Sequence, residues 1–335
     1  MSWYSIKVPE DIAVSTRIRL ARNISGYPFP SKITECQFAE IKQKIKNLIS
    51  DKGIGAFGNL KYIEMSDIPE NERYAMVERH IISPQFVSKC EKKAIIISED
   101  ESVCIMLGEE DHIRIQVIKA GFELESAYNT ANEIDNLICD NFDIAFDEKL
   151  GFLTECPTNL GTGLRASVML HLPVLTSVGE IAQISDSVGK FGYTIRGMYG
   201  EGTKPAGAYY QISNQITLGI SEKNALDNLS VIASQIIEKE KNACKNINKT
   251  AFEDLCMRSL GTLKYARILS SDEMMKHLSN IKLGISIGII KENICPTTLL
   301  IEGQPYMLMR RFGDMNSTER DICRAEMLRK ELNEI

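Results

Sequence analysis

The apolar and polar residues of this chain follow two periods over roughly its first 250 positions. Apolar side chains alternate with polar ones over residues 11–22, which predicts a strand. Arg17 and Arg19 lie two residues apart on that strand and therefore project from the same side of it. Elsewhere β-branched runs predict strands, and apolar residues spaced three or four apart predict helices. The other predicted strands span residues 94–98, 102–107, 113–118, 193–196, 208–213 and 215–218, and the predicted helices span residues 34–50, 70–80, 123–139, 178–191 and 222–244.

Helical patterns dominate the rest of the chain. The tetrads 270–273 and 316–319 each carry Ser or Asn followed three residues later by Glu, the pattern of a capping box at the start of a helix. We therefore expect two domains, one of strands and helices over residues 1–250 and a smaller helical one over residues 251–335. The polar-to-mixed stretch 291–314 is predicted to be a mobile connection.

Composition narrows the class of protein. The chain has 335 residues, 44% of them hydrophobic and 25% charged, as in ordinary soluble globular proteins. Its net charge of -6 argues against partnership with nucleic acid or an acidic membrane. The nine cysteines form neither a CxxC pair nor a Cys/His cluster at zinc spacing, which is typical of thiols in a reducing compartment. The N-terminus has no apolar signal region and no stretch is long enough to span a bilayer, so we expect a cytoplasmic protein.

Five arginines lie on separate predicted strands and loops: Arg17, Arg19, Arg114, Arg165 and Arg196. Guanidinium groups match phosphate oxygens with paired hydrogen bonds, so a convergence of these arginines would hold a triphosphate without a P-loop. The glycine-rich residues 197–204 nearly match a P-loop, but their Gly-Thr-Lys order is wrong for that motif. A lone histidine at the end of a helix, such as His80, is by itself more often structural than catalytic.

Two glutamates on different loops, Glu110 and Glu201, suggest a second substrate that is cationic. A guanidinium is protonated at physiological pH and is a poor nucleophile, so its phosphorylation needs carboxylates that align it and accept its proton. The stretch 156–171 adds a thiol at Cys156, a proline turn and two close glycines before an arginine and an apolar run. That order is typical of an anion-handling loop that runs into a strand.

Five motifs in this order resemble the ATP:guanidino phosphotransferases, the phosphagen kinase family, and above all their bacterial branch of protein arginine kinases. They are STRIR at 15–19, EEDHIR at 109–114, CPTNLGTGLRASVM at 156–169, RGMYGE at 196–201 and ISN at 212–214. The resemblance covers about residues 10–245. It implies an α+β fold, with an antiparallel β-sheet flanked by helices as in the glutamine-synthetase-like catalytic domain of that family, and MgATP as the phosphoryl donor.

The resemblance also implies roles for individual residues. The five arginines and His80 would hold the nucleotide, Glu110 and Glu201 would grip the guanidinium with Glu110 as the proton acceptor, and Cys156 would act beside it as an orienting thiolate. The nucleotide site would comprise Ser15, Thr16, Arg17, Ile18, Arg19, His80, Arg114, Arg165, Ala166, Ser167, Val168, Met169, Arg196, Gly197, Met198, Tyr199, Gly200 and Glu201. Gly108 stands where the family usually has Asn, a change that we expect to be tolerated.

Two departures favour the bacterial branch over kinases of free metabolites. Those enzymes carry a helical domain of about a hundred residues before the first arginine pair, whereas here the pair lies at positions 17 and 19. The C-terminal part instead carries an RDxxRA pattern, formed by Arg320, Asp321, Ile322, Cys323, Arg324 and Ala325. The resemblance implies that this pattern is a regulatory phosphoarginine pocket, and its two arginines are four apart and so share a helix face. A solvated helix face is the simpler interpretation of the pattern alone.

We therefore predict an ATP-dependent kinase of protein arginine residues that marks proteins for Clp-type degradation and takes part in stress regulation. An activator protein, the Clp protease system and a homodimer or higher homo-oligomer are the expected partners. The alternatives are a phosphagen kinase of free arginine and an inactive phosphoarginine-binding adaptor. Retention of Glu110, Glu201 and all five arginines argues against the adaptor.

Overall fold

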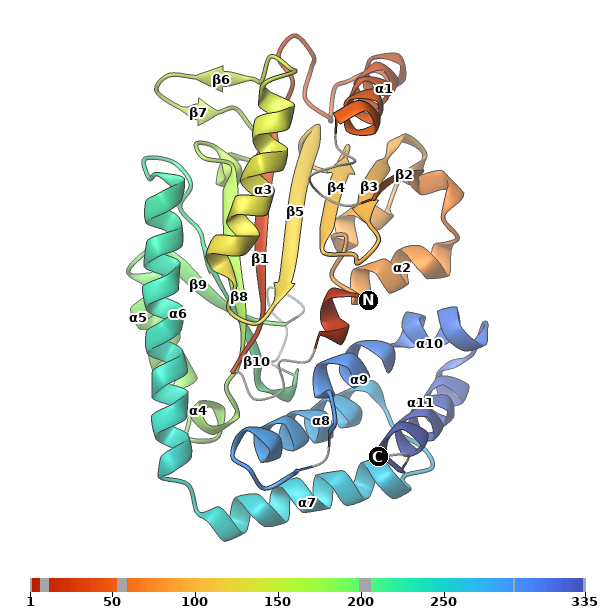
Figure 1. The fold of residues 1–335 in the computed structure, drawn as a ribbon, viewed down its shortest axis with the longest axis vertical. Helices are drawn as coiled ribbons and strands as arrows, with labels where there is room; N and C mark the ends of the chain where they lie inside the picture. The colour runs from red at the N-terminus through yellow and green to blue at the C-terminus, as the bar shows by residue number, and fades with distance from the viewer. Residues whose placement is uncertain (1, 7–11, 53–58, 199–205, 292, 334–335) are drawn as a thin grey trace.

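A computed structural model describes residues 2–6, 12–52, 59–198, 206–291 and 293–333. Its centre is an antiparallel sheet of eight strands in the order β2-β3-β4-β5-β1-β8-β10-β9 (Figure 1). The strands are β1 (Ala13–Arg22), β2 (Leu60–Glu64), β3 (Ala94–Ser98), β4 (Val103–Leu107), β5 (Ile113–Ala120), β8 (Leu164–His171), β9 (Tyr193–Gly197) and β10 (Tyr209–Asn214). A separate small hairpin pairs β6 (Phe146–Asp147) with β7 (Gly151–Phe152).

One face of the sheet is covered by helices. Ile18 and Leu20 of β1 and Val168 of β8 are fully buried there, in a core that also takes the apolar sides of α1, α3 and α6. Figure 1 shows α3 lying along β1 and β5, with α6 along the β8 side of the sheet. The helices of this part are α1 (Glu35–Lys52), α2 (Glu70–Glu78), α3 (Leu124–Cys139), α4 (Pro173–Ser177), α5 (Ile181–Gly189) and α6 (Glu222–Lys245).

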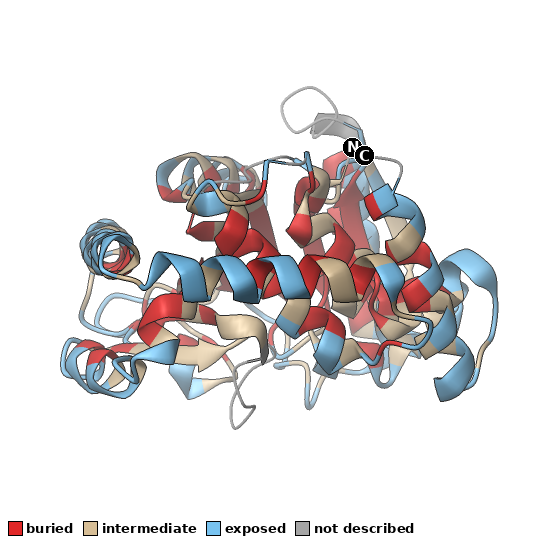
Figure 2. Cartoon of the chain, turned by 90° about the horizontal axis from the view of Figure 1, so that it is seen from below, coloured by how far each residue is buried: buried red, intermediate tan, exposed pale blue. Residues whose placement is uncertain are grey.

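Five further helices of the described chain pack around a second core, in which Leu278 and Leu328 are fully buried. Figure 2 shows the molecule from below, with buried and exposed positions on the same helices. They are α7 (Lys249–Tyr265), α8 (Ser271–Ser286), α9 (Pro296–Glu302), α10 (Pro305–Phe312) and α11 (Ser317–Asn333). The N-terminal turn η1 (Trp3–Ser5) joins this core, because Trp3 and Tyr4 are buried in it. These helices therefore pack around the start of the chain as well as around one another.

The α2 and α10 helices connect the two parts of the molecule. The carboxylate of Glu78, near the end of α2, accepts hydrogen bonds from the backbone N–H groups of Tyr306 (3.1 Å) and Met307 (2.8 Å). The rings of Tyr74 and Tyr306 stack with their centroids 4.6 Å apart. Burial raises the pKa of Glu78 to about 7. The contact thus caps the first turn of α10 with a partly buried carboxylate.

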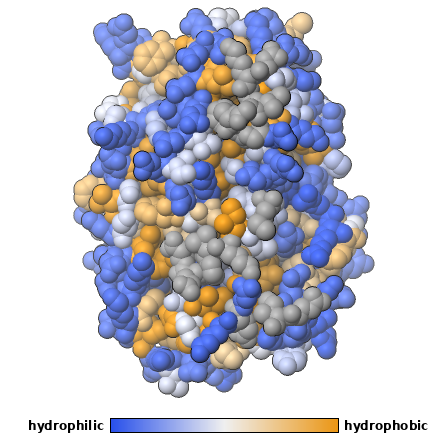
Figure 3. All heavy atoms as spheres, viewed as in Figure 1, coloured by the Kyte–Doolittle hydropathy of each residue, from blue (hydrophilic) through white to orange (hydrophobic). Residues whose placement is uncertain are grey.

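Most of the predicted elements are confirmed, and local side-chain hydrogen bonds cap the starts of α6, α7, α8 and α11. The backbone N–H of Asn316 donates to Glu319 Oε2 and that of Glu319 donates to Asn316 Oδ1, which is the reciprocal capping box expected there. The sheet is antiparallel, as the resemblance implies. None of the described helices is both long and apolar enough to cross a membrane. Hydrophilic residues predominate on the surface that Figure 3 shows, with apolar residues between them.

Two predictions of local structure are wrong, and a third is correct only over a shorter range. Residues 215–218 are not a strand, because the chain turns out of the sheet after β10 and Thr217 packs against the 158–160 segment through its hydroxyl. The stretch 291–314 is not a mobile connection, since its described residues include α9 and α10. The predicted helix 178–191 is present in shorter form as α5, which begins only at Ile181 because Gly179 has a left-handed φ of +77°. The short helix α4, which ends before Gly179, was not predicted.

Candidate active site

The register of the strands gathers arginines on the sheet face that the α3 and α6 core leaves uncovered. Residues directly opposite each other in an antiparallel pair project from the same face. Arg19 of β1 lies opposite Gln116 of β5 and Arg165 of β8, and Arg17 lies one row further along. Arg114 shares this face because it is two residues from Gln116. Ser213 of β10 lies in the same row of side chains as Arg17. Gln211 is two residues from Ser213 and lies opposite Arg196 of β9, so Arg196 also projects from this face. We call these five arginines the arginine face.

Burial and mutual repulsion act on the arginine face. Burial and then the charge of Arg19 lower the pKa of Arg114 to about 9. The pKa of Arg19 falls to about 10 through burial and the charge of Arg165, and that of Arg17 is well below its ordinary value for the same kinds of reason. Cations held this close together in a partly dry site favour an anionic ligand, whose charge would relieve the repulsion.

His80 lies beside the arginine face on a strained turn. Its φ of 59° is left-handed, a conformation that costs a residue with a side chain about 1–3 kcal/mol unless the surroundings hold it. Two donors hold it: Gln116 Nε2 bonds the carbonyls of His80 (2.9 Å) and Ile81 (2.7 Å), and Trp3 Nε1 bonds the carbonyl of Arg79 (3.0 Å). Burial and the charge of Arg17 lower the pKa of His80 to about 4, so its imidazole is neutral at physiological pH.

The acidic turn between β4 and β5 divides its residues between two roles. Glu109 contacts Ser83 Oγ and Arg114 Nη1, while the more exposed Glu110 has Oε2 4.0 Å from the same Arg114 nitrogen. Asp111 and His112 are buried and structural. The Asp111 carboxylate accepts from Asn23 Nδ2 (2.7 Å), and His112 Nδ1 accepts from a backbone N–H of the segment after β1. Of these four residues, Glu110 is therefore the exposed carboxylate at the edge of the arginine face.

Cys156 lies next to this turn. Asp111 also accepts a hydrogen bond from the backbone N–H of Glu155 (2.8 Å), which fastens the Cys156 loop to the acidic turn. The Sγ atom of Cys156 is 3.1 Å from Thr158 Oγ1. Cys156, Glu109 and Glu110 line one cavity of about 430 Å³. The fold thus brings the thiol and a carboxylate together from segments 46 positions apart.

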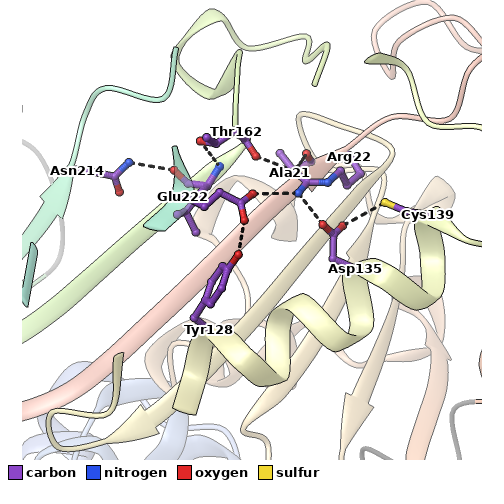
Figure 4. Close-up of polar contacts among 9 residues, drawn as sticks. Ala21, Arg22, Tyr128, Asp135, Cys139, Thr162, Asn214 and Glu222 are labelled. Carbon is purple, nitrogen blue, oxygen red and sulfur yellow. Dashed lines mark hydrogen bonds and ion pairs between the residues drawn. The ribbon is translucent and has the colours of Figure 1, made fainter. Parts of the chain in front are cut away.

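A sixth arginine, Arg22 at the end of β1, projects from the opposite face of the sheet. Arg22 has the opposite parity to Arg17 and Arg19, and its guanidinium lies among the helices (Figure 4). Its Nη2 is 2.6 Å from Asp135 Oδ2 and 3.5 Å from Glu222 Oε1, and Tyr128 donates to the same glutamate. Its Cζ also stacks 3.6 Å from the centroid of the Phe152 ring. With its charge neutralised in this way, Arg22 has a structural role.

The structure places the other residues of the predicted nucleotide site in two groups. Thr16, Ile18, Ala166 and Val168 project from the sheet face opposite to the arginines, and their side chains are buried. They can therefore contribute only backbone atoms to the arginine face. Ser15, Ser167 and Met169 have the parity of the arginines. Gly197 ends β9 and Met198 follows it. The predicted residues Tyr199, Gly200 and Glu201 lie outside the described part of the chain.

Two residues of the site were not predicted. Gln116 lies in the same row of side chains as Arg19 and supports the His80 turn, and Glu109 contacts Arg114. Parity provides a signal for Gln116, because it follows Arg114 by two positions on one strand. The sequence carries no comparable signal for Glu109, whose direction depends on how the turn packs against Ser83.

The RDxxRA helix differs from the expectation of two arginines on one exposed face. Arg324 is fully buried and donates to the carbonyls of Gly303 and Leu269 (both 2.7 Å) and to Asp321 Oδ1 (2.6 Å). Arg320 is only partly buried and lies 3.6 Å from Met309 Sδ. The two arginines therefore do not form one exposed pair, because Arg324 is buried and paired with Asp321 within the same helix.

Comparison with known proteins agrees with this geometry. Residues 40–243 match the family described as ATP:guanido phosphotransferase, C-terminal catalytic domain, and residues 249–335 match the protein-arginine kinase McsB C-terminal domain. Among solved structures, a lombricine kinase superposes with a TM-score of 0.62 at 24% identity, over 71% of this chain and 70% of that one, which shows the fold. The fold and the family match define an ATP-using phosphotransferase, and the chain belongs to the ATP:guanido phosphotransferase family.

Curated relatives narrow the branch. The protein-arginine kinase of Halothermothrix orenii is 42% identical over 99% of this chain and 96% of its own length. That of Clostridium tetani is 43% identical over 96% of this chain and 95% of its own length. Within the family, the chain accordingly groups with the protein-arginine kinases over nearly its whole length.

Proposed function

We propose that this protein transfers the terminal phosphoryl group of ATP to the guanidinium of arginine side chains in other proteins. The observation that carries the proposal is the position of the arginine face beside a cavity lined by Glu110 and Cys156. Phosphoryl transfer depends on positioning and charge stabilisation, and the two parts of this site supply them for an anionic donor and a cationic acceptor.

On the donor side, the arginine face would bind the phosphate oxygens of ATP. A fixed guanidinium cluster needs little rearrangement as charge develops on the transferred group, which is the basis of electrostatic catalysis. His80, neutral and held by Gln116, would contact the nucleotide next to Arg17. Residues Ser15–Arg19, Arg165–Met169 and Arg196–Glu201 would complete the nucleotide site, as the motifs imply.

On the acceptor side, Glu110 and Glu201 would align the guanidinium, and Glu110 would accept its proton as the new P–N bond forms. Glu110 is suited to this because it is accessible and its contact with Arg114 is long, at 4.0 Å. Cys156, which lines the same cavity, would help to orient the guanidinium.

Mg²⁺ would arrive with the nucleotide. The described residues contain no cluster of three or more His, Cys, Asp or Glu side chains placed to hold a metal ion. Magnesium commonly keeps several waters and binds through substrate phosphates, so an arginine-lined site accommodates it in this way. Its contribution would be to neutralise charge on the transferred phosphoryl group.

The helical part after residue 250 would be a second domain that regulates the first. Arg320 and Asp321 remain accessible enough to meet a phosphoarginine, while Arg324 holds Asp321 in place. Degradation of the marked proteins by a Clp-type protease, an activator protein, a homo-oligomeric state and a cytoplasmic location complete the proposal on the strength of the family resemblance.

The test is phosphate transfer by the purified protein with MgATP to an unfolded arginine-containing protein and to free arginine. We expect acid-labile phosphate on the protein substrate. Glu110→Gln should lower the rate by about 10²–10⁴-fold while nucleotide binding persists. Glu99→Gln, which changes an exposed carboxylate in the β3–β4 turn, is the matched control and should keep wild-type turnover. Near wild-type turnover in Glu110→Gln, or transfer to free arginine alone, would refute the proposal.

A further inference from the structure

The cavity beside Glu110 and Cys156 extends beyond what a guanidinium needs. Its volume of about 430 Å³ lies in the usual range of about 300–1,000 Å³ for sites that enclose a small molecule. One apolar wall of the cavity consists of Pro30, Ile33 and Phe38, from the segment between β1 and α1 and the first turn of α1. We call this wall the flank wall.

The flank wall packs closely against the acidic turn. Gly108, the residue before Glu109, has a left-handed φ of +82°, and a Cβ atom there would lie 2.8 Å from two ring carbons of Phe38. The glycine therefore lets the Phe38 ring reach the base of the turn that carries Glu110. A larger residue at position 108 would push this ring away from the turn.

The rest of the segment is tied down on both sides. The carbonyl of Pro28 is 2.8 Å from His112 Nε2, and the backbone N–H of Ser31 donates to Glu155 Oε2 (3.1 Å). The start of α1 is fixed by the reciprocal bonds of Thr34 with Gln37. The flank wall is thus held in one position relative to both Glu110 and Cys156.

Polar groups that line the cavity are largely engaged elsewhere. Lys93 Nζ donates to the carbonyls of Gln85 (3.3 Å), Phe86 (3.1 Å) and Ser88 (2.5 Å), which uses the three donors of an ammonium group. Lys92 pairs with Glu35 at 3.0 Å, and Lys89 is exposed at the rim. What remains for a ligand beside the flank wall is mainly apolar surface, which gains free energy when it is covered.

We propose that the flank wall binds an apolar side chain of the polypeptide substrate, two positions away from the arginine that is phosphorylated. This inference rests on the proposed function, because it uses Glu110 and Cys156 to locate the target arginine. Side chains two residues apart in an extended chain project to the same side, about 7 Å apart. An arginine directed at Glu110 would therefore bring the residue two positions away toward the same cavity.

The protein would accordingly favour arginines whose neighbours are apolar and lie in an extended segment. Apolar residues are buried in most folded proteins, so such segments become available mainly when a protein unfolds. The flank wall would make the enzyme selective for unfolded chains through ordinary apolar contact.

The experiment compares two peptides that are identical except for Leu or Ser at both positions two residues from a single arginine. Coverage of most of a leucine side chain gives an expected kcat/KM ratio of about ten-fold in favour of the Leu peptide. Ile33→Ser should reduce the ratio to near one, and Phe38→Leu should reduce it in part. Ile220→Ser changes another partly buried isoleucine and should leave the ratio intact.

The ratio within each variant, and not the absolute rate, is the readout, so a general loss of stability does not imitate the effect. Equal kcat/KM for the two peptides with the wild-type protein would overturn the flank wall alone. If neither peptide were phosphorylated, the proposed function would be overturned, and the flank wall with it.

Discussion

Gln116 offers a sharp test of how the fold prepares the nucleotide site. Its side chain amide bonds two carbonyls of the His80 turn at 2.9 and 2.7 Å, and the residue is only 3% exposed. Methionine has a similar length without the amide, so Gln116→Met keeps the packing and removes the donor. A buried polar group left without a partner costs about 1–3 kcal/mol, and we expect a loss of about 2–3 kcal/mol in the free energy of unfolding.

Part of that loss should appear in nucleotide binding. The left-handed conformation of His80 is strained, and without Gln116 the turn can relax away from Arg17. If about 1.4 kcal/mol of the lost energy acts on the position of His80, KM for ATP rises about ten-fold. The turnover number should change by less than about three-fold, because neither residue contacts the acceptor.

The assay is steady-state kinetics with ATP varied at saturating protein substrate, together with urea unfolding. The matched control is Gln304→Met, which removes another buried glutamine amide, one that bonds the Leu300 carbonyl at 2.9 Å among the C-terminal helices. The control should lose stability and keep KM for ATP. If Gln116→Met also loses stability and keeps its KM, Gln116 merely supports the fold and the reasoning about the His80 turn is wrong.

Three further predictions concern stability and regulation. Arg22→Met should lower the free energy of unfolding by about 3–5 kcal/mol because it leaves buried Asp135 unpaired. The control Arg258→Met breaks an exposed pair with Asp254 and should cost under about 1 kcal/mol. Equal losses for the two variants in urea unfolding would contradict this. Burial raises the pKa of Glu78 from 4.5 to about 7, so the folded state binds this proton more tightly and the free energy of unfolding should fall as pH rises from about 4.5 to about 7. Glu78→Gln should make this fall smaller. An unchanged dependence of the unfolding free energy on pH would exclude Glu78 as its source. Arg324→Met should destabilise the C-terminal helices, because it removes the hydrogen bonds to Leu269 and Gly303. Arg320→Met should keep the stability and weaken the binding of phosphoarginine measured by calorimetry. Wild-type affinity in Arg320→Met would show that Arg320 does not bind phosphoarginine.

Much of the local structure was predictable because its causes are local. The capping box at 316–319 and the strand 113–118 follow from side chains that interact with their own neighbourhood. The error at 215–218 has a non-local cause. Those residues have strand-like composition, but Thr217 bonds the carbonyls of Thr158 and Leu160 and the chain leaves the sheet there.

The arginines show the same division. Parity along β1 was enough to place Arg17 and Arg19 on one side of a strand, and it would also have separated Arg22 from them. It could not show that Arg165 lies opposite Arg19, because the pairing of β1 with β8 joins residues about 146 positions apart. It also could not show that Arg324 is buried, since that depends on carbonyls contributed by Leu269 and Gly303.

By itself, the sequence determined the motifs, their order, the family and the periodicity of most elements, because each of these is expressed in neighbouring residues. Only the tertiary structure decided which side chains meet. It brought Glu110 and Cys156 to one cavity, set Phe38 against Gly108 and held His80 in its strained turn with Gln116. The physical reason is that these contacts join distant parts of the chain, and their geometry is set by packing of the whole core, which no local pattern encodes.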